Sequence, residues 1–399
     1  MGDRPSLSAM TRNARVFLLG EAVLAAFGGF ILPIYVLYFR YYGISLFDVA
    51  LLAAVFEASV LVFELPTGLF ADRFGRKLSV VVGFGLFALS GLVFIALKSL
   101  IGFILAEILF GLAEAFISGA GEALAVDSFP GEDKARCLEK LFIRRSRIRI
   151  AVTALAMTVA GSAYALNADV TFVPVVFGGI AGLALSLFYD SAGESDRTPT
   201  RFWEPVVFLF SRLRAVSILK TIFIVSLIAN FAYEGADQFW QVLGSEYFGI
   251  NPGYFGFFTA AGVVGSFFLV GPVTRRFSGN MSLPLLILLA AGVAVTSFPN
   301  GPRTVWPFLL IIYFVARELV RPLFSTAINM AIDSRGRATF LSGYNLTCSI
   351  GEVASGIVVG LIASRIGLPF VFVIGGAVLV VSMIVALFAG GISPAGRRE

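Results

Sequence analysis

Long apolar runs, separated by short polar breaks, follow one another along nearly the whole chain. A membrane-spanning helix needs about 20 mainly apolar residues, and twelve runs in this sequence are long enough. The longest polar break falls between the sixth and the seventh run. The pattern therefore predicts twelve helices in two groups of six, over residues 15–39, 46–71, 78–97, 100–126, 139–165 and 170–190, and then 215–244, 252–273, 281–299, 304–332, 337–364 and 368–389.

Composition agrees with a lipid environment. Hydrophobic residues make up 58% of the 399 positions and charged residues only 14%, whereas a soluble domain has about 25% charged residues. A single water-soluble core does not grow to this size without dividing into domains. We therefore expect an all-α membrane protein.

Several kinds of chemistry are excluded by what the sequence lacks. It has no histidine and only two cysteines, Cys137 and Cys348, which are too few and too far apart to suggest a disulfide framework. We therefore expect no zinc site of the usual kind and no Ser-His-Asp or Cys-His catalysis. With no P-loop and no G-x-S-x-G, neither ATP-driven transport nor an enzyme is expected. We expect no cofactor and no metal.

The distribution of basic residues predicts the orientation in the membrane. Lys and Arg stay on the cytoplasmic side, and placing the N-terminus there puts most of the 30 basic residues in cytoplasmic segments. The basic N-terminal segment is followed by a long apolar run without a small-residue cleavage site. This run is predicted to be the first membrane span and not a signal peptide. Both termini are then expected in the cytoplasm, and the protein in a bacterial inner membrane. The basic residues behind the net charge of +5 are expected to contact anionic lipids, and no nucleic-acid binding is expected. The basic residues expected on the opposite side are Arg40, Lys98, Arg303 and Arg365.

The two halves repeat each other at three places. YFRYYGIS (38–45) matches SEYFGINP (245–252), and GLFADRFGRKLS (68–79) matches GPVTRRFSGNMS (271–282). AVDSFPGEDKAR (125–136) likewise matches AIDSRGRA (331–338). Internal repeats in a multi-span protein indicate a transporter with its site at the repeat interface. The predicted domains are a six-helix bundle over 1–190, a cytoplasmic linker over 191–214 and a second bundle over 215–399.

The loop after the second predicted helix reads GLFADRFGRK (68–77). It resembles the G-x-L-A-D-R-x-G-R-K motif of the major facilitator superfamily, and its degenerate copy follows the eighth helix. The resemblance implies two pseudo-symmetric six-helix bundles, a monomer, and alternating access by a rocking motion. It also implies a cytoplasmic gate formed by Gly68, Asp72, Arg73, Gly75, Arg76, Lys77 and Asp127.

The residues of this gate suit such a role. Gly68 and Gly75 permit close helix contact and a tight turn, and Asp72 can accept hydrogen bonds from a helix N-terminus. The basic residues of the motif can pair with Asp127 at the end of the fourth helix. The alternative is that these charges only mark topology.

Two stretches, 64–68 and 118–128, look like those of bacterial drug-efflux members of the superfamily. Two departures weigh against efflux. Helix five lacks the proline-containing G-x-x-x-G-P-x-x-G-G motif, and Glu107 stands on helix four, where many members carry an arginine.

Charged residues within the apolar runs are candidates for a site. A charge at mid-bilayer costs roughly 2.5–3.5 kcal/mol, so it should face a cavity or a partner. Carboxylates there can bind and release protons, although a static ion pair with Arg317 is an alternative. In the superfamily the first, fourth, seventh and tenth helices surround the central cavity, and most of the candidates fall on them. The candidates for substrate or proton binding are Glu21, Glu57, Glu107, Glu114, Glu234, Asp237, Arg317, Glu318 and Arg144.

Helix five and the end of helix one carry two further clusters. Arg144 and Arg147 share a helix face and either attract an anionic substrate or extend to lipid phosphates. Tyr35, Tyr38, Tyr41 and Tyr42 are interpreted as an interfacial aromatic belt, with a ligand-binding group as the alternative.

Three functions remain open. The first is proton-coupled export of a small amphipathic organic compound. The second is transport of an organic anion or lipid through Arg144, Arg147 and Arg317. The third is a receptor that kept a transporter fold, against which the intact loop motif argues. The expected partners are a small-molecule substrate, protons and membrane lipids.

Overall fold

The computed structural model describes residues 10–129, 134–190, 217–277, 282–331 and 337–388, and within them it is helical without strands. Nine described helices are long and apolar enough to cross a membrane. The apolar helices α12 (Ser282–Ser297) and α15 (Leu368–Phe388) are shorter, and α13 (Trp306–Ala331) carries charged residues near its middle. Of α15 it is the segment Leu368–Ile384 that forms the shorter apolar run. Together these helices account for the twelve expected spans and confirm the all-α membrane fold.

The chain divides into two compact units. The first contains Met1–Tyr42 and Val55–Thr198, and the second contains Gly43–Ala54 and Pro199–Glu399. Helix α3 (Leu46–Phe74) therefore begins in the second unit and continues in the first. The linker predicted over 191–214 lies outside the described residues.

Two predicted spans of the first unit are broken. The first span stops at Ile31 and resumes at Tyr35, because Pro33 lacks a backbone N–H and cannot continue a helix interior. The fourth span is interrupted at Gly119. The continuous helices 15–39 and 100–126 were thus wrong at these points. Besides α3, the elements are α1 (Arg12–Ile31), α2 (Tyr35–Tyr41), α4 (Arg76–Ala96), α5 (Leu100–Ser118), α6 (Ala120–Asp127), α7 (Lys134–Leu166), the 3-10 turn η2 (Ala168–Phe172) and α8 (Val173–Ser186).

Aromatic rings and small residues hold the first unit together. The rings of Phe94 and Phe172 stack with centroids 3.8 Å apart and an angle of 13° between their planes. Helix α8 lies close to α4 where Gly179 faces the backbone of Ala88 and Gly182 faces the ring of Phe84. Small residues allow such close approach between membrane helices.

Two of the tyrosines that follow α1 form hydrogen bonds to polar groups of the first unit. Tyr38 is fully buried and its hydroxyl donates to the carbonyl of Phe94 at 2.7 Å. Tyr42 donates to Asp169, which also pairs with Lys98 at 2.6 Å. The hydrogen bond to Asp169, followed by that to Tyr42, raises the pKa of Lys98. An interfacial belt was the wrong interpretation for Tyr38, and only Tyr41 of the four is strongly exposed.

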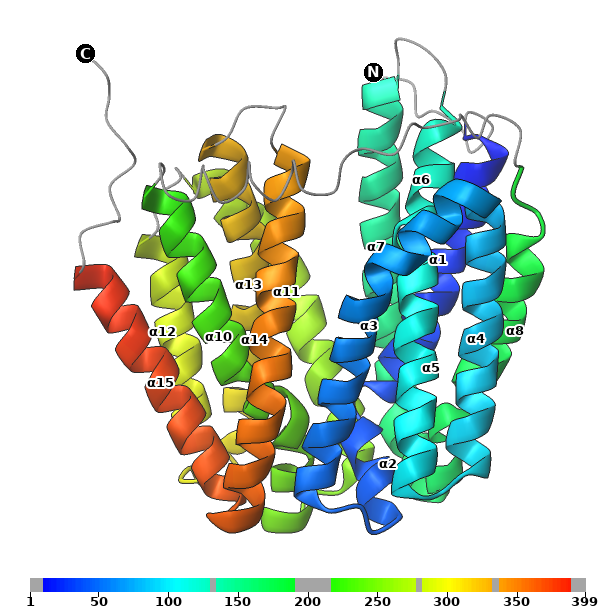
Figure 1. Cartoon of the computed structure of the whole chain (residues 1–399). Helices are drawn as coiled ribbons and strands as arrows, with labels where there is room; N and C mark the ends of the chain where they lie inside the picture. Colours follow the sequence, from blue (N-terminus) through cyan, green and yellow to red (C-terminus); the bar gives the residue numbers. More distant parts are fainter. Residues whose placement is uncertain (1–9, 130–133, 191–216, 278–281, 332–336, 389–399) are drawn as a thin grey trace, which may run out of the picture. The chain divides into compact units, whose positions relative to one another are not determined.

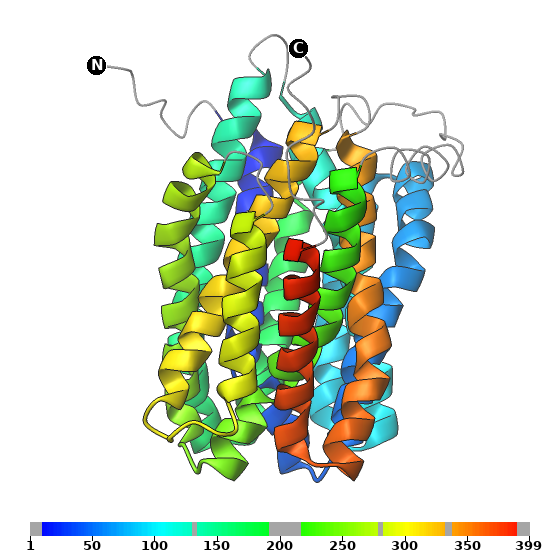
Figure 2. The same cartoon turned by 90° about the vertical axis from the view of Figure 1, so that its left-hand side faces the viewer.

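The second unit pairs helices that are distant in sequence. Helix α12 lies beside α15, and α10 (Ser217–Val242) lies beside α14 (Arg337–Arg365) (Figures 1 and 2). Trp240 and Trp306 are buried near one end of the unit. Besides these helices and α13, the elements are the π-helical turn η3 (Leu243–Tyr247), the 3-10 turn η4 (Pro252–Tyr254) and α11 (Phe255–Arg276).

Candidate functional site

In the first unit, two arginines of α7 bind one acidic side chain of α1. Arg145 contacts the Glu21 carboxylate at 3.0 Å and Arg149 contacts it at 2.7 Å. Glu21 is only 6% exposed, and two cations compensate the cost of burying its charge. The two arginines are four positions apart, so they project from the same face of α7.

Arg145 also links this pair to a third helix. It contacts Glu122 of α6 at 2.8 Å, and its guanidinium lies 5.3 Å from the centre of the Phe17 ring. The break at Gly119 starts the new helix that carries Glu122. Ion pairs thereby join α1, α6 and α7.

A cavity of about 90 Å³ adjoins these ion pairs, and Glu114 of α5 lines it with Glu21, Arg145 and Arg149. Glu21 and Glu122 are paired with the arginines, whereas Glu114 has no hydrogen bond or ion pair among the described residues. Three carboxyl groups therefore face two guanidinium groups. The cluster has one positive charge fewer than its carboxyl groups, and Glu114 is the carboxyl group that makes no ion pair.

Glu107 lies elsewhere on α5, in a different environment. It is fully buried, and one oxygen accepts a hydrogen bond from the Tyr35 hydroxyl at 2.5 Å while Oε2 has no partner. Glu57 of α3 is close enough to interact with it electrostatically. Both residues are separate from the cavity that Glu114 lines.

In the second unit, Asp237 of α10 forms an ion pair with Arg317 of α13 and accepts a hydrogen bond from Tyr313 at 2.5 Å. The static ion pair considered for Arg317 is therefore present. It fixes both side chains, because Asp237 is bound through both of its oxygens.

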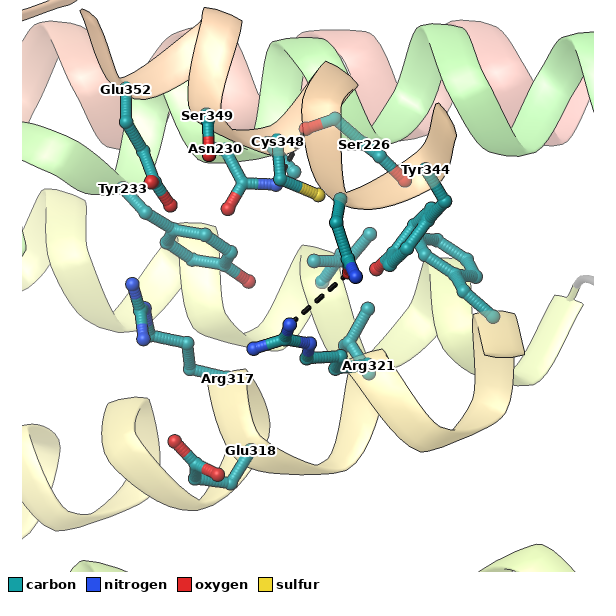
Figure 3. A pocket seen from close by; sticks show the side chains of 15 residues that line it. Ser226, Asn230, Tyr233, Arg317, Glu318, Arg321, Tyr344, Cys348, Ser349 and Glu352 are labelled. Carbon is teal, nitrogen blue, oxygen red and sulfur yellow. Dashed lines mark hydrogen bonds between the residues drawn. The ribbon is translucent and has the colours of Figure 1, made fainter. Parts of the chain in front are cut away.

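A larger cavity of about 230 Å³ lies beside this pair, between α10, α13 and α14 (Figure 3). Arg317 and Arg321 reach it from α13, four positions apart on one helix face. In the view of Figure 3, the Tyr233 ring lies between these arginines and Glu352 of α14. Asn230 and Cys348 complete the polar wall.

Several polar groups of this cavity are unsatisfied in the part of the chain that the structure describes. The Tyr233 hydroxyl and Arg317 Nε are buried and make no hydrogen bond. Arg321 bonds only the amide oxygen of Asn345, at 3.2 Å, and Glu352 has no hydrogen bond or ion pair. Because buried polar groups are normally bonded, this arrangement fits a cavity that receives a polar ligand.

The remaining charged candidates lie outside these two clusters or at their edge. Glu234 is buried and accepts a hydrogen bond from Gln238, and Glu318 is exposed at the edge of the larger cavity. Arg144 contacts the sulfur of Met10, and Arg147 is exposed. Neither Arg144 nor Arg147 lines either cavity.

The loop motif forms one expected ion pair and a connection of one residue between two helices. Arg76 contacts Asp127 at 2.5 Å, so the pairing expected for Asp127 is present, whereas Asp72 and Arg73 are exposed. Gly75 alone joins α3 to α4, with φ of 96° and ψ of 143°, and so makes the expected tight turn. No close helix contact exists at Gly68: a side chain there would meet no atom within 4 Å.

Comparison with known proteins places the chain in a family. The profile of the Major Facilitator Superfamily matches residues 17–351. The chain belongs to the major facilitator superfamily. It is accordingly a multi-pass membrane transporter, and the resemblance of the loop motif is confirmed.

The similarity to several relatives covers nearly the whole length of this superfamily member. It is 26% identical to the uncharacterized transporter YxaM of Bacillus subtilis, over 89% of this chain and 90% of the relative. It is 23% identical to the quinolone resistance protein NorA of Staphylococcus aureus, over 91% and 94%. The structure of the nucleoside transporter NupG superposes with a TM-score of 0.77 at 12% identity, over 94% and 98%, which shows a shared fold.

Sequence reasoning on this superfamily member missed Arg145, Arg149 and Glu352. The spacing of Arg145 and Arg149 was a usable signal, but Arg144 and Arg147 also share a face, and the sequence does not say which face of α7 turns inward. Glu352 is an isolated acidic residue in an apolar helix. That signal was available, although the charged candidates were sought mainly on the first, fourth, seventh and tenth helices.

Proposed function

We propose that this superfamily member is a secondary active transporter that works by alternating access and exports a small amphipathic organic compound in exchange for protons. The observation that carries the proposal is the charge imbalance in the first unit, where Glu114 makes no ion pair in a cavity that it lines with Glu21, Arg145 and Arg149. A proton on Glu114 would complete the balance. Gaining and losing that proton would change the electrostatics of the whole cluster.

The other acidic candidates support the choice of Glu114. Glu21 is bound by two arginines and Asp237 by Arg317 and Tyr313. An acid held in an ion pair already has its charge compensated and gains little from a proton. Glu114 combines an unpaired carboxyl group with a place in a cavity.

The names of two relatives support export. Multidrug resistance protein 2 of Bacillus subtilis is 24% identical over 92% of this chain, and NorA carries quinolone resistance in its name. Export with proton exchange fits a bacterial cytoplasmic membrane, across which protons are driven inward. We place the protein there as a monomer with both termini in the cytoplasm.

The test is Glu114→Gln in proteoliposomes with an imposed pH gradient. We expect the unmodified protein to accumulate a quinolone such as ciprofloxacin against its concentration gradient. Glu114→Gln should lose this accumulation and still equilibrate the compound across the membrane, because only the proton-binding group is removed. Fluorescence of the quinolone inside the proteoliposomes measures both its accumulation and its equilibration.

Glu139→Gln is the matched control, since Glu139 is exposed on α7. It should transport as the unmodified protein does. Concentrative transport by Glu114→Gln at the rate of the unmodified protein would contradict proton coupling through this residue.

Transport of an organic anion or lipid is a second candidate. Its support now comes from Arg317 and Arg321, which line the cavity of the second unit, and no longer from Arg144 and Arg147. The two candidate functions differ in the charge of the transported compound. Binding of compounds of different charge to that cavity can distinguish them.

A further inference from the structure

Two opposite charges in the cavity of the second unit lack partners. Arg321 on α13 is exposed and bonds only an amide oxygen, and Glu352 on α14 makes no ion pair or hydrogen bond among the described residues. Their side chains do not pair with each other, although both line the same cavity. In an ion pair kept only for structure, these two charges would be joined.

The neighbouring charged residues do not form ion pairs with Arg321 or Glu352 among the described residues. Arg317 is matched by Asp237, whose second oxygen is held by Tyr313. Glu318 points away from Arg317 and Arg321 in Figure 3 and is exposed. One positive and one negative charge thus remain, with two buried donors, the Tyr233 hydroxyl and Arg317 Nε, left without acceptors.

We propose that this cavity binds a small zwitterion, with its acidic group at Arg321 and the Tyr233 hydroxyl and its ammonium group at Glu352. A ligand with both charges satisfies both residues at once and adds no net charge to the cavity. A ligand with one charge pairs with only one of the two residues and adds a net charge to the cavity. The inference rests on the proposed transport function and names the chemical class of its cargo.

Size sets a second condition. The cavity measures about 230 Å³, which is below the roughly 300–1,000 Å³ of pockets for drug-sized ligands. It accommodates a single ring or a short chain with its two charged groups. Tyr233 and Tyr344 supply aromatic surface for such a ring.

Cys348 offers a reporter of occupancy. It lies one helical turn from Glu352, lines the cavity and is partly exposed, and the only other cysteine in the sequence is Cys137 on α7. Cys137→Ser therefore leaves one thiol, inside the proposed site. A small neutral reagent, methyl methanethiosulfonate, should modify it, and a bound ligand should slow that reaction.

The experiment compares three molecules of nearly equal shape on Cys137→Ser protein in detergent. They are 4-(aminomethyl)benzoic acid, which is a zwitterion, 4-methylbenzoic acid, which is an anion, and 4-methylbenzylamine, which is a cation. We expect the zwitterion to protect Cys348 at the lowest concentration. Arg321→Gln and Glu352→Gln should each weaken its protection by about 10- to 100-fold, as expected for the loss of one charged hydrogen bond.

Arg365→Gln, at the exposed end of α14, is the matched control and should leave protection unchanged. Thermal stabilisation of the unmodified protein by the three compounds should rank them in the same order, so the result does not depend on the variants folding. Equal protection by all three, protection by none, or stronger protection by the anion or the cation would overturn the inference. Neither assay uses a gradient, so this outcome is independent of whether Glu114 couples transport to protons.

Discussion

Acidic side chains buried in the first unit are stabilised by different partners. Glu21 is held by two arginines, whereas Glu107 is held by the hydroxyl of Tyr35 at 2.5 Å and has its second oxygen unbonded. A buried group that loses its only hydrogen bond bears the full cost of its lost hydration. The environment of Glu107 is therefore sensitive to small changes in Tyr35.

Tyr35→Phe removes a single hydroxyl and leaves the ring in place. We expect it to lower the free energy of unfolding by about 1–3 kcal/mol, because both oxygens of Glu107 are then unbonded. The midpoint of thermal unfolding in detergent measures this. Tyr41→Phe is the control: Tyr41 is 66% exposed, so an equal loss of stability in both variants would contradict the assignment.

For the candidate site, the sequence predicted the types of the charged residues but not which way their side chains point. The sequence identified Arg317 as a candidate with an acidic partner, and Asp237 is that partner. It did not distinguish Arg145 and Arg149 from their neighbours, because arginines occupy several faces at the start of α7. Tyr38 was misread because its position near a helix end is shared by interfacial and buried residues, and only packing separates them.

Helices α3 and α4 meet at Gly75 with no loop between them. At φ of 96° the backbone of Gly75 has a conformation that essentially only glycine adopts, since a Cβ atom would clash with the neighbouring peptide. The nearby Gly68 lies inside α3 and faces open space. The two glycines of one motif therefore have different physical roles.

Gly75→Ala should lower the free energy of unfolding by about 1–3 kcal/mol through backbone strain. Gly68→Ala should leave it unchanged or raise it by up to about 1 kcal/mol, because alanine favours a helix interior more than glycine. Thermal unfolding of both variants side by side is the measurement. A destabilised Gly68→Ala, or an unaffected Gly75→Ala, would show that this assignment is reversed.

Helix positions were predicted well because each span must be long enough to cross the hydrocarbon layer. The errors were the interruptions at Pro33 and Gly119, where apolar sequence continues through a break in the helix. Hydropathy does not register a break of this kind. The break before Tyr35 and the start of α6 nonetheless decide where Tyr35 and Glu122 are placed.

For the protein as a whole, the distribution of basic residues predicts both termini in the cytoplasm. Fusion of green fluorescent protein to the C-terminus should give fluorescent cells, because the fused protein folds in the cytoplasm. Alkaline phosphatase fused after Gly249, in the connection before η4, should be active, since that connection is expected on the outer side. An inactive phosphatase at this position, or a C-terminal fusion without fluorescence, would contradict the predicted orientation.

The volume of the second unit's cavity has a consequence for how cargo is discriminated. At about 230 Å³ it has room for a single ring or a short chain with two charged groups, so a larger molecule can place only such a charged end in it. Compounds with unrelated scaffolds and the same head group should then compete with one another. Close chemical relatives that differ only in the head group should not compete, so breadth towards scaffolds and strictness towards charge would coexist in one protein.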